Sequence, residues 1–218
     1  MTLAQAVLGL QNCVPSLIRI TLGVGAAFVL GVALGYARYC LPEAMRRNFL
    51  VNFLIEAPRY PPPIAWIPFV ILWVGIGELS AVLIVVIGAF FPIFTSTYVG
   101  MWSVPRPILW AANSFELSRW SFFRGVLFPA ALPQILSGLR IGLGMGWMSV
   151  IAAEMIGADS GLGYSIQLYR VNMQYGAMAY DMALIALVGY LLTLLMALLE
   201  KRALHWMDVK GGGQDASA

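Results

Sequence analysis

A stretch without any charged residue runs from Leu79 to Pro105, and it is long enough to cross a lipid bilayer. A spanning helix needs about 20 consecutive apolar residues. Over the whole chain 61% of the residues are hydrophobic and 11% are charged, whereas a soluble domain carries about 25% charged residues. A water-soluble core has no room for so much apolar surface. The sequence therefore predicts an all-α integral membrane protein.

Apolar stretches recur along the chain and predict about five transmembrane helices. Four stretches are continuous and cover approximately residues 14–37, 79–105, 135–155 and 180–199. The other is interrupted, because Pro61, Pro62 and Pro63 separate the apolar residues 49–57 from the apolar residues 64–77. Proline removes a backbone donor and ends a helix. We expect one membrane domain over residues 1–205, followed by a flexible tail at 206–218 that is rich in glycine near its end.

The proline-rich interruption at residues 59–68 allows two interpretations. Non-helical backbone at membrane depth is tolerated where it is buried in protein or faces water. In the first interpretation, Pro63, Trp66 and Pro68 line a translocation pathway or its gate. In the second, the segment is a kink that packs against neighbouring helices.

The distribution of basic residues predicts the orientation in the membrane. One predicted side carries most of them, namely Arg38, Arg46, Arg47, Lys201, Arg202 and the arginines of residues 106–133. An excess of Lys and Arg marks the cytoplasmic side. The N-terminus is then outside, and the C-terminus and residues 106–133 are cytoplasmic. Topology rather than nucleic-acid binding explains the net charge of +3.

The two cysteines, Cys13 and Cys40, flank the first predicted span. A helix between them would hold them roughly 40 Å apart at 1.5 Å per residue. A disulfide needs Cα atoms within about 7 Å. We therefore expect no disulfide within the chain.

Residues 106–133 are the longest segment that belongs in water. Pro107 suits the first turn of a helix, and Ser118 is a good N-cap for a second helix, so we expect a corner at Glu116 and Leu117. Such a structured loop is a candidate contact for a soluble partner. The candidate contact residues are Ala111, Ala112, Phe115, Glu116, Ser118, Arg119, Trp120 and Pro129. The other interpretation is an amphipathic loop on the lipid surface.

Three charged residues near the ends of the fourth span are further pathway or gate candidates. Arg140 is either an anchor that reaches the lipid headgroups or a pathway residue. Glu154 and Asp159 either form an outer gate or partner contact, or make a structural pair with Arg170. Glu78 is expected at the membrane interface.

The sequence holds no recognisable catalytic or metal-binding motif. There is one histidine, His205. No phosphate-binding motif of the GxxxxGK[ST] type and no Cys/His metal cluster occurs. We therefore expect no enzymatic activity and no cofactor in this chain.

Residues 110–129 resemble the EAA loop of the permease subunits of bacterial ABC importers. That family has a Glu-Ala-Ala triplet, a glycine further on and a closing proline. The matching residues here are Trp110-Ala111-Ala112, Glu116 and Val126-Leu127-Phe128-Pro129. Residues 63–77 and 129–163 are similar to the branch for nitrate, sulfonate, taurine and bicarbonate. The resemblance covers roughly residues 15–205.

The resemblance implies an ATP-driven permease in the bacterial inner membrane that imports a small anion. It also implies a homodimer, an extracytoplasmic solute-binding protein, and two copies of an ABC ATPase that bind ATP and Mg. Trp110 and Glu116 stand where the family has Glu and Gly. A Glu in the left-handed backbone region costs on the order of 1 kcal/mol. Either the corner is therefore right-handed, or the loop docks differently.

Two other classes of protein remain as alternatives. A secondary transporter or channel needs no ATPase, but it favours charges at mid-span or a twofold repeat, and the sequence shows neither. A structural subunit of a larger membrane complex needs no pathway and no break at residues 59–68.

Overall fold

The computed structural model describes residues 3–208, and every regular element in this range is helical. Four helical segments of this range are long and apolar enough to cross a membrane: Val7–Tyr39, Glu78–Trp102, Arg119–Gly157 and Tyr175–Ala203. They contain the long helices α1 (Leu3–Tyr39), α5 (Glu78–Trp102), α8 (Phe128–Gly157) and α10 (Tyr175–Ala203). The predicted all-α membrane fold is confirmed.

Helix α5 packs against both α1 and α8 through glycines on the two outer helices. A Cβ atom on Gly31 of α1 would lie 2.8 Å from Cγ2 of Ile93, which is fully buried on α5. A Cβ atom on Gly142 of α8 would lie 2.9 Å from the carbonyl oxygen of Ala89. Small residues let helices approach this closely in a membrane, where packing rather than water exclusion drives association. These three helices form the centre of the bundle.

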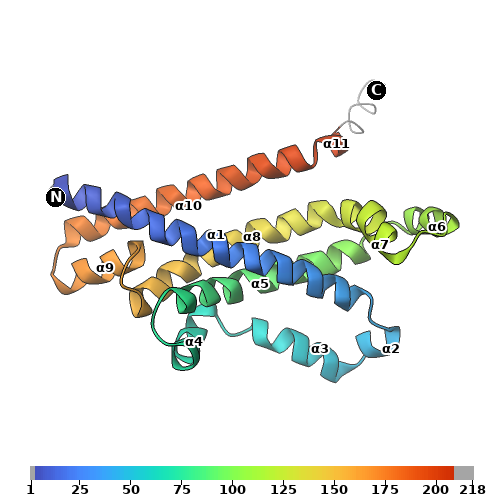
Figure 1. Ribbon diagram of the computed structural model, residues 1–218, viewed down its shortest axis with the longest axis horizontal. Helices are drawn as coiled ribbons and strands as arrows, with labels where there is room; N and C mark the ends of the chain where they lie inside the picture. Colours follow the sequence, from blue (N-terminus) through green and yellow to red (C-terminus); the bar gives the residue numbers. More distant parts are fainter. Residues whose placement is uncertain (1–2, 209–218) are drawn as a thin grey trace, which may run out of the picture.

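The interrupted second stretch is not a single spanning helix. It forms α3 (Phe49–Glu56), the 3₁₀ turns η1 (Ala57–Arg59) and η2 (Pro63–Trp66), and α4 (Ile67–Val74). Pro62 is extended, with φ −62° and ψ 147°, which stops the helical hydrogen-bond ladder as expected. The described residues therefore contain four continuous spanning helices and one broken segment, which matches the predicted four continuous stretches and one interrupted stretch. This segment leads the chain back along the bundle from the end of α1 to the start of α5 (Figure 1).

The two ends of the bundle differ in the elements that they carry. Figure 1 shows the N-terminus, α4 and α9 (Leu162–Val171) at one end, which we call the α9 end. The other end, the α6 end, holds α2 (Glu43–Arg46), α6 (Arg106–Ser114) and α7 (Arg119–Phe122), together with the last turns of α10. The basic residues that were predicted to share one side therefore lie at the α6 end.

Other sequence predictions need smaller corrections. The fourth span, expected at residues 135–155, is part of a longer helical segment, because α7 continues through the π-helical turn η3 (Phe123–Leu127) into α8. Cys13 and Cys40 are both free, as predicted. The start of the predicted tail belongs to α11 (His205–Asp208), and residues 209–218 lie outside the described range.

Candidate functional site

Helix α6 presents one face to the protein and the other to the surroundings. Pro107 lies in its first turn, as predicted. Leu109 packs against the core cluster around Met101 and Leu127, and Ala112 is 94% buried, with 6% of its surface exposed. Trp110 and Ala111 are exposed. Ala112 therefore holds α6 on the bundle, while its neighbour Ala111 is available for contact.

The corner after α6 has a left-handed backbone. Glu116 has φ +48°, and its N–H donates to the carbonyl oxygen of Asn113 at 3.1 Å. The alternative of a right-handed corner is therefore wrong. Left-handed backbone costs a non-glycine residue roughly 1–2 kcal/mol, so Glu116 is strained at the position where the EAA family has glycine.

Helix α7 begins at a capped position and leaves two aromatic rings exposed. The Ser121 N–H donates to the Ser118 hydroxyl at 3.2 Å, which confirms the predicted N-cap. Phe115 is 75% exposed and Trp120 is 66% exposed. The Trp120 ring stacks on Phe123 with a centroid separation of 5.7 Å, so its position is defined despite its exposure.

We call Trp110, Ala111, Phe115, Leu117 and Trp120 the loop surface, since all five are exposed. Of the other loop candidates, Arg119 is exposed beside this surface and Pro129 is half-buried in the first turn of α8. Phe122 and Phe123 pack partly against the core cluster around Leu127. They support the loop surface from below rather than form part of it.

The α9 end contains a buried charge network. Arg19 of α1 is 99% buried, with 1% exposed, and donates to Oε1 of Glu154 on α8 at 2.8 Å. It also pairs with Glu78 at the start of α5 and donates to the carbonyl oxygen of Ser160 at 2.7 Å. One arginine side chain therefore joins α1, α5, α8 and the segment before α9.

The remaining oxygen of Glu154 is satisfied by backbone and hydroxyl donors. The Gly163 N–H donates to Oε2 of Glu154 at 2.9 Å. The Ser16 hydroxyl lies 2.7 Å from Oε1 and 2.9 Å from Oε2, and it accepts from the Leu162 N–H at 3.1 Å. The network thus fixes the start of α9 against α1 and α8.

This network corrects one predicted pairing and adds residues that sequence reasoning missed. The ion partner of Glu154 is Arg19 rather than Arg170, which is exposed. Glu78, which was expected at the membrane interface, is exposed at the start of α5 and also pairs with Arg19. Asp159 is exposed and takes no part in the network. An arginine inside a predicted span was the available signal, because such a group needs a partner.

Arg140 also has an acidic partner. Its guanidinium contacts the carboxylate of Glu200 on α10, and 47% of its side chain is exposed. The pair links α8 to α10 near the α6 end.

The pathway candidates of the broken segment differ in exposure. Pro63 and Trp66 are half-buried, and Pro68 is exposed. Trp66 packs partly against the core cluster around Ile67, and its indole N–H has no hydrogen-bond partner in the described residues. The segment therefore packs on the bundle with one side and leaves the other side free.

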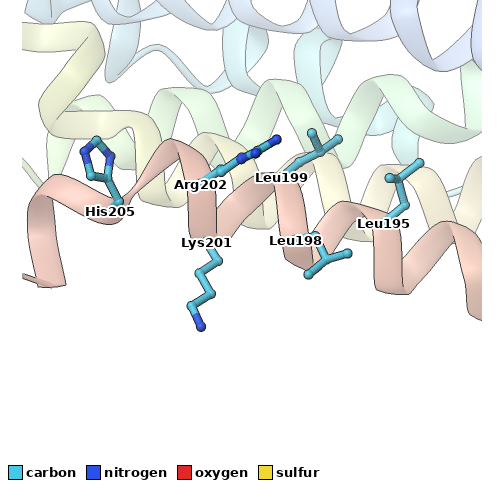
Figure 2. A pocket seen from close by; sticks show the side chains of 6 residues that line it. All are labelled: Leu195, Leu198, Leu199, Lys201, Arg202 and His205. Atoms are coloured by element: carbon cyan, nitrogen blue, oxygen red, sulfur yellow. The ribbon is translucent and has the colours of Figure 1, made fainter.

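A surface hollow of about 490 Å³ adjoins the end of α10. It is lined by Leu195, Leu198, Leu199, Lys201, Arg202 and His205. Figure 2 shows the Leu198 and Lys201 side chains pointing away from the rest of the bundle. The lining side chains all come from α10 and from His205 just after it. The hollow therefore has no opposing wall that would enclose a solute.

The chain matches the family model described as binding-protein-dependent transport system inner membrane component over residues 20–205. It is 36% identical over 196 residues to the taurine transport system permease protein TauC of Escherichia coli, covering 90% of this chain and 70% of that protein. It is 33% identical over 185 residues to the nitrate import permease protein NrtB of a Synechocystis species, covering 85% of this chain and 66% of that protein.

A solved structure has the same fold. A chain in the inward-facing structure of the MetNI methionine ABC transporter superposes with a TM-score of 0.80 at 21% sequence identity, covering 93% of this chain and 99% of that chain. In the described residues no group of three or more His, Cys, Asp or Glu side chains is placed to hold a metal ion. With the family model matched over most of its length, this chain belongs to the inner membrane components of binding-protein-dependent transport systems, and it is an ABC importer permease.

Proposed function

We propose that this chain forms the translocation pathway of an ATP-driven importer for a small anion, and that an ABC ATPase docks on the loop surface. The observation that carries the proposal is the exposed pair Phe115 and Trp120 at the basic end of the bundle. Aromatic side chains with large exposed area are the typical anchors of protein interfaces. The relatives named for taurine and nitrate support a sulfonate or nitrate class of substrate.

The long helical segment that follows the loop offers a physical route for coupling. Residues Arg119–Gly157 form 39 residues of continuous helix, which at 1.5 Å per residue is about 60 Å long. Trp120 lies at one end of it and Glu154 at the other. A displacement of the loop surface by the ATPase would therefore move the backbone at the opposite end of the bundle.

We further propose that two copies of the chain enclose the pathway. Ile141, Gly144, Met145 and Met148 recur at helical spacing on α8, and all four are exposed. A second copy that packs beside this face would enclose a pathway between the two chains. Two ATPase copies with bound ATP and Mg would then clamp the two loop surfaces.

The proposed ATPase docking also implies an orientation of the bundle in the membrane. The α6 end with its basic residues would face the cytoplasm together with the C-terminus, and the α9 end would face the solute-binding protein. The exposed Asp159 and Arg170 lie near α9 and are available for that contact. ATP would shift the permease between outward-open and inward-open states by binding one of them more tightly.

The test is a purification of the tagged chain in mild detergent, followed by mass spectrometry of the proteins that accompany it. We expect a soluble ATPase subunit in equal amounts. Ala111→Arg should reduce that yield by about tenfold, because a buried, unpaired charge at an interface costs more than 1.4 kcal/mol. Ala112→Arg is unsuitable, because Ala112 is buried in the bundle and its replacement disturbs the fold.

The matched control is Ala44→Arg, since Ala44 is exposed on α2 at the same end of the bundle but outside the loop surface. It should leave the ATPase yield unchanged. A chain that purifies alone, or an Ala111→Arg variant that retains its ATPase, would contradict docking on the loop surface.

A further inference from the structure

A groove of about 290 Å³ lies between the broken segment and the core helices α5 and α8. Arg59 of η1 contributes to one side, and Thr95 and Ser96 of α5 to another. Phe91 and Pro92 of α5 also line it, and α8 contributes Ile141 and Met145. These two residues belong to the exposed α8 face, so the groove opens beside the face where we place the pathway.

Arg59 is an exposed residue, and it differs in its partners from three other arginines that contact the spanning helices. Arg19, Arg38 and Arg140 each pair with a carboxylate. Among the described residues no acidic side chain pairs with Arg59. Its guanidinium carbon lies 5.5 Å from the centroid of the Tyr60 ring, which is a cation–π contact. A charge at membrane depth is costly unless it has a partner, water or a ligand. The groove therefore holds an uncompensated cation.

The two hydroxyl groups in the groove are also free. Some Thr and Ser hydroxyls of the spanning helices donate to the carbonyl four residues earlier, as Thr97 does to Ile93 at 2.7 Å and Ser149 to Met145 at 2.7 Å. Within the described range neither Thr95 nor Ser96 makes such a bond, and both are partly exposed. Two hydroxyl donors and a guanidinium thus border the same space.

We propose that this groove is an anion-binding site of the translocation pathway, in which Arg59 binds the oxyanion group and the hydroxyls of Thr95 and Ser96 donate to it. This inference rests on the proposed function, whose substrate class it deepens. A guanidinium forms two parallel hydrogen bonds to a planar or tetrahedral oxyanion. The groove has a volume of about 290 Å³. The volumes of ligand pockets span about 300–1,000 Å³, so this groove is a small one. It therefore suits a sulfonate or nitrate rather than a large solute.

The position of the groove suits a site that is reached late during import. Thr95 is close to three-quarters of the way along α5, on the side of the loop surface. The helical structure stops after Arg59 and resumes at η2, and at this break Arg59 lines the groove together with residues of α5. A proline-rich interruption at this depth thereby gains a role, because it allows a charged side chain to reach the groove.

The experiment uses the full chain in lipid nanodiscs, with radiolabelled ethanesulfonate as the probe in equilibrium dialysis. We expect saturable binding that nitrate displaces and ethanolamine, which lacks the anionic group, does not. Arg59→Gln should weaken ethanesulfonate binding by about tenfold or more, because a charge-assisted bidentate contact is lost. Arg59→Lys should retain part of the affinity, since it keeps the charge without the fork.

Matched variants separate this role from a structural one. Thr95→Val should weaken binding severalfold, whereas Thr97→Val removes a buried hydroxyl two positions further on and should have no effect. Arg47→Gln, at an exposed arginine outside the groove, should also bind normally. Thermal unfolding of every variant in the same nanodiscs confirms that the fold is retained.

The outcomes distinguish this inference from the proposed function. If wild type does not bind ethanesulfonate, if Arg59→Gln binds it normally, or if ethanolamine competes equally, the anion site is overturned even where the ATPase co-purifies. If binding depends on Arg59 and Thr95 while no ATPase accompanies the chain, the anion site stands and the ATP-driven mechanism fails.

Discussion

The α9 end of the bundle buries charged side chains, whereas the α6 end exposes aromatic side chains. At the α9 end, Arg19 and Glu154 are almost fully buried and bonded to each other and to surrounding donors and acceptors. At the α6 end, Phe115 and Trp120 are exposed and Glu116 is strained. The comparison teaches that the Arg19 network is completed by the chain itself, while the loop surface has area to offer to a partner.

The physical reason lies in what each kind of group costs. A buried charge is strongly destabilising unless every hydrogen bond is made, so the Arg19 network has to be closed within the folded chain. Exposed aromatic area leaves free energy to be gained when a partner covers it. Substitutions at the α9 end should therefore change stability, and those on the loop surface should change partner binding.

The largest effect is expected from Arg19→Met, which leaves Glu154 buried without its cation. Breaking a buried ion pair by removing one partner costs about 3–5 kcal/mol. Thermal unfolding of the purified protein measures the loss. Arg47→Met is the control, because the Arg47–Glu43 pair is exposed and such pairs contribute about 0–1 kcal/mol. Equal stability of the two variants would show that the buried network does not hold this end together.

A smaller effect is expected from Gly161→Ala at the same end. Gly161 has φ +108°, and a Cβ atom there would lie 2.5 Å from the carboxylate oxygens of Glu154. Backbone strain of this kind costs about 1–3 kcal/mol, so the unfolding temperature should fall. Gly25→Ala has open space around it and should be neutral or slightly stabilising. A Gly161→Ala variant as stable as wild type would mean that the Gly161 loop is free to move away from Glu154.

The smallest effect is expected at the α6 end, from Glu116→Gly. Glycine takes the left-handed conformation without penalty, so the variant should be more stable by about 1 kcal/mol or less. Its ATPase yield on purification should be unchanged or higher. Loss of the ATPase with normal stability would instead show that the Glu116 side chain makes a specific contact, and that the strain is retained for function.

Features that depend on local chemistry were predictable. The long apolar stretches, the proline break before Pro63 and the Ser118 N-cap each follow from neighbouring residues, and the structure confirms them. The corner at Glu116 was located, but its handedness was not. A backbone dihedral at one residue depends on how α6 is held by Leu109 and Ala112, which are packed against distant parts of the chain.

Features that depend on contacts between distant residues were missed or misassigned. Arg19 and Glu154 are separated by 135 positions, and the sequence analysis named Arg170 instead as a structural partner for Glu154. The groove at Arg59 was also missed, because its walls come from three separate elements, η1, α5 and α8. Spacing along the chain carries no information about which helices become neighbours.

The order of apolar and polar segments was enough to establish an all-α membrane protein and the segment that leaves the bundle as a loop, because the hydrophobic thickness of a bilayer acts on each segment alone. The packing of α1, α5 and α8 decided which charges are paired and which aromatic rings stay exposed. Ion pairing and exposure depend on the distance between side chains in space, and only the folded arrangement defines that distance.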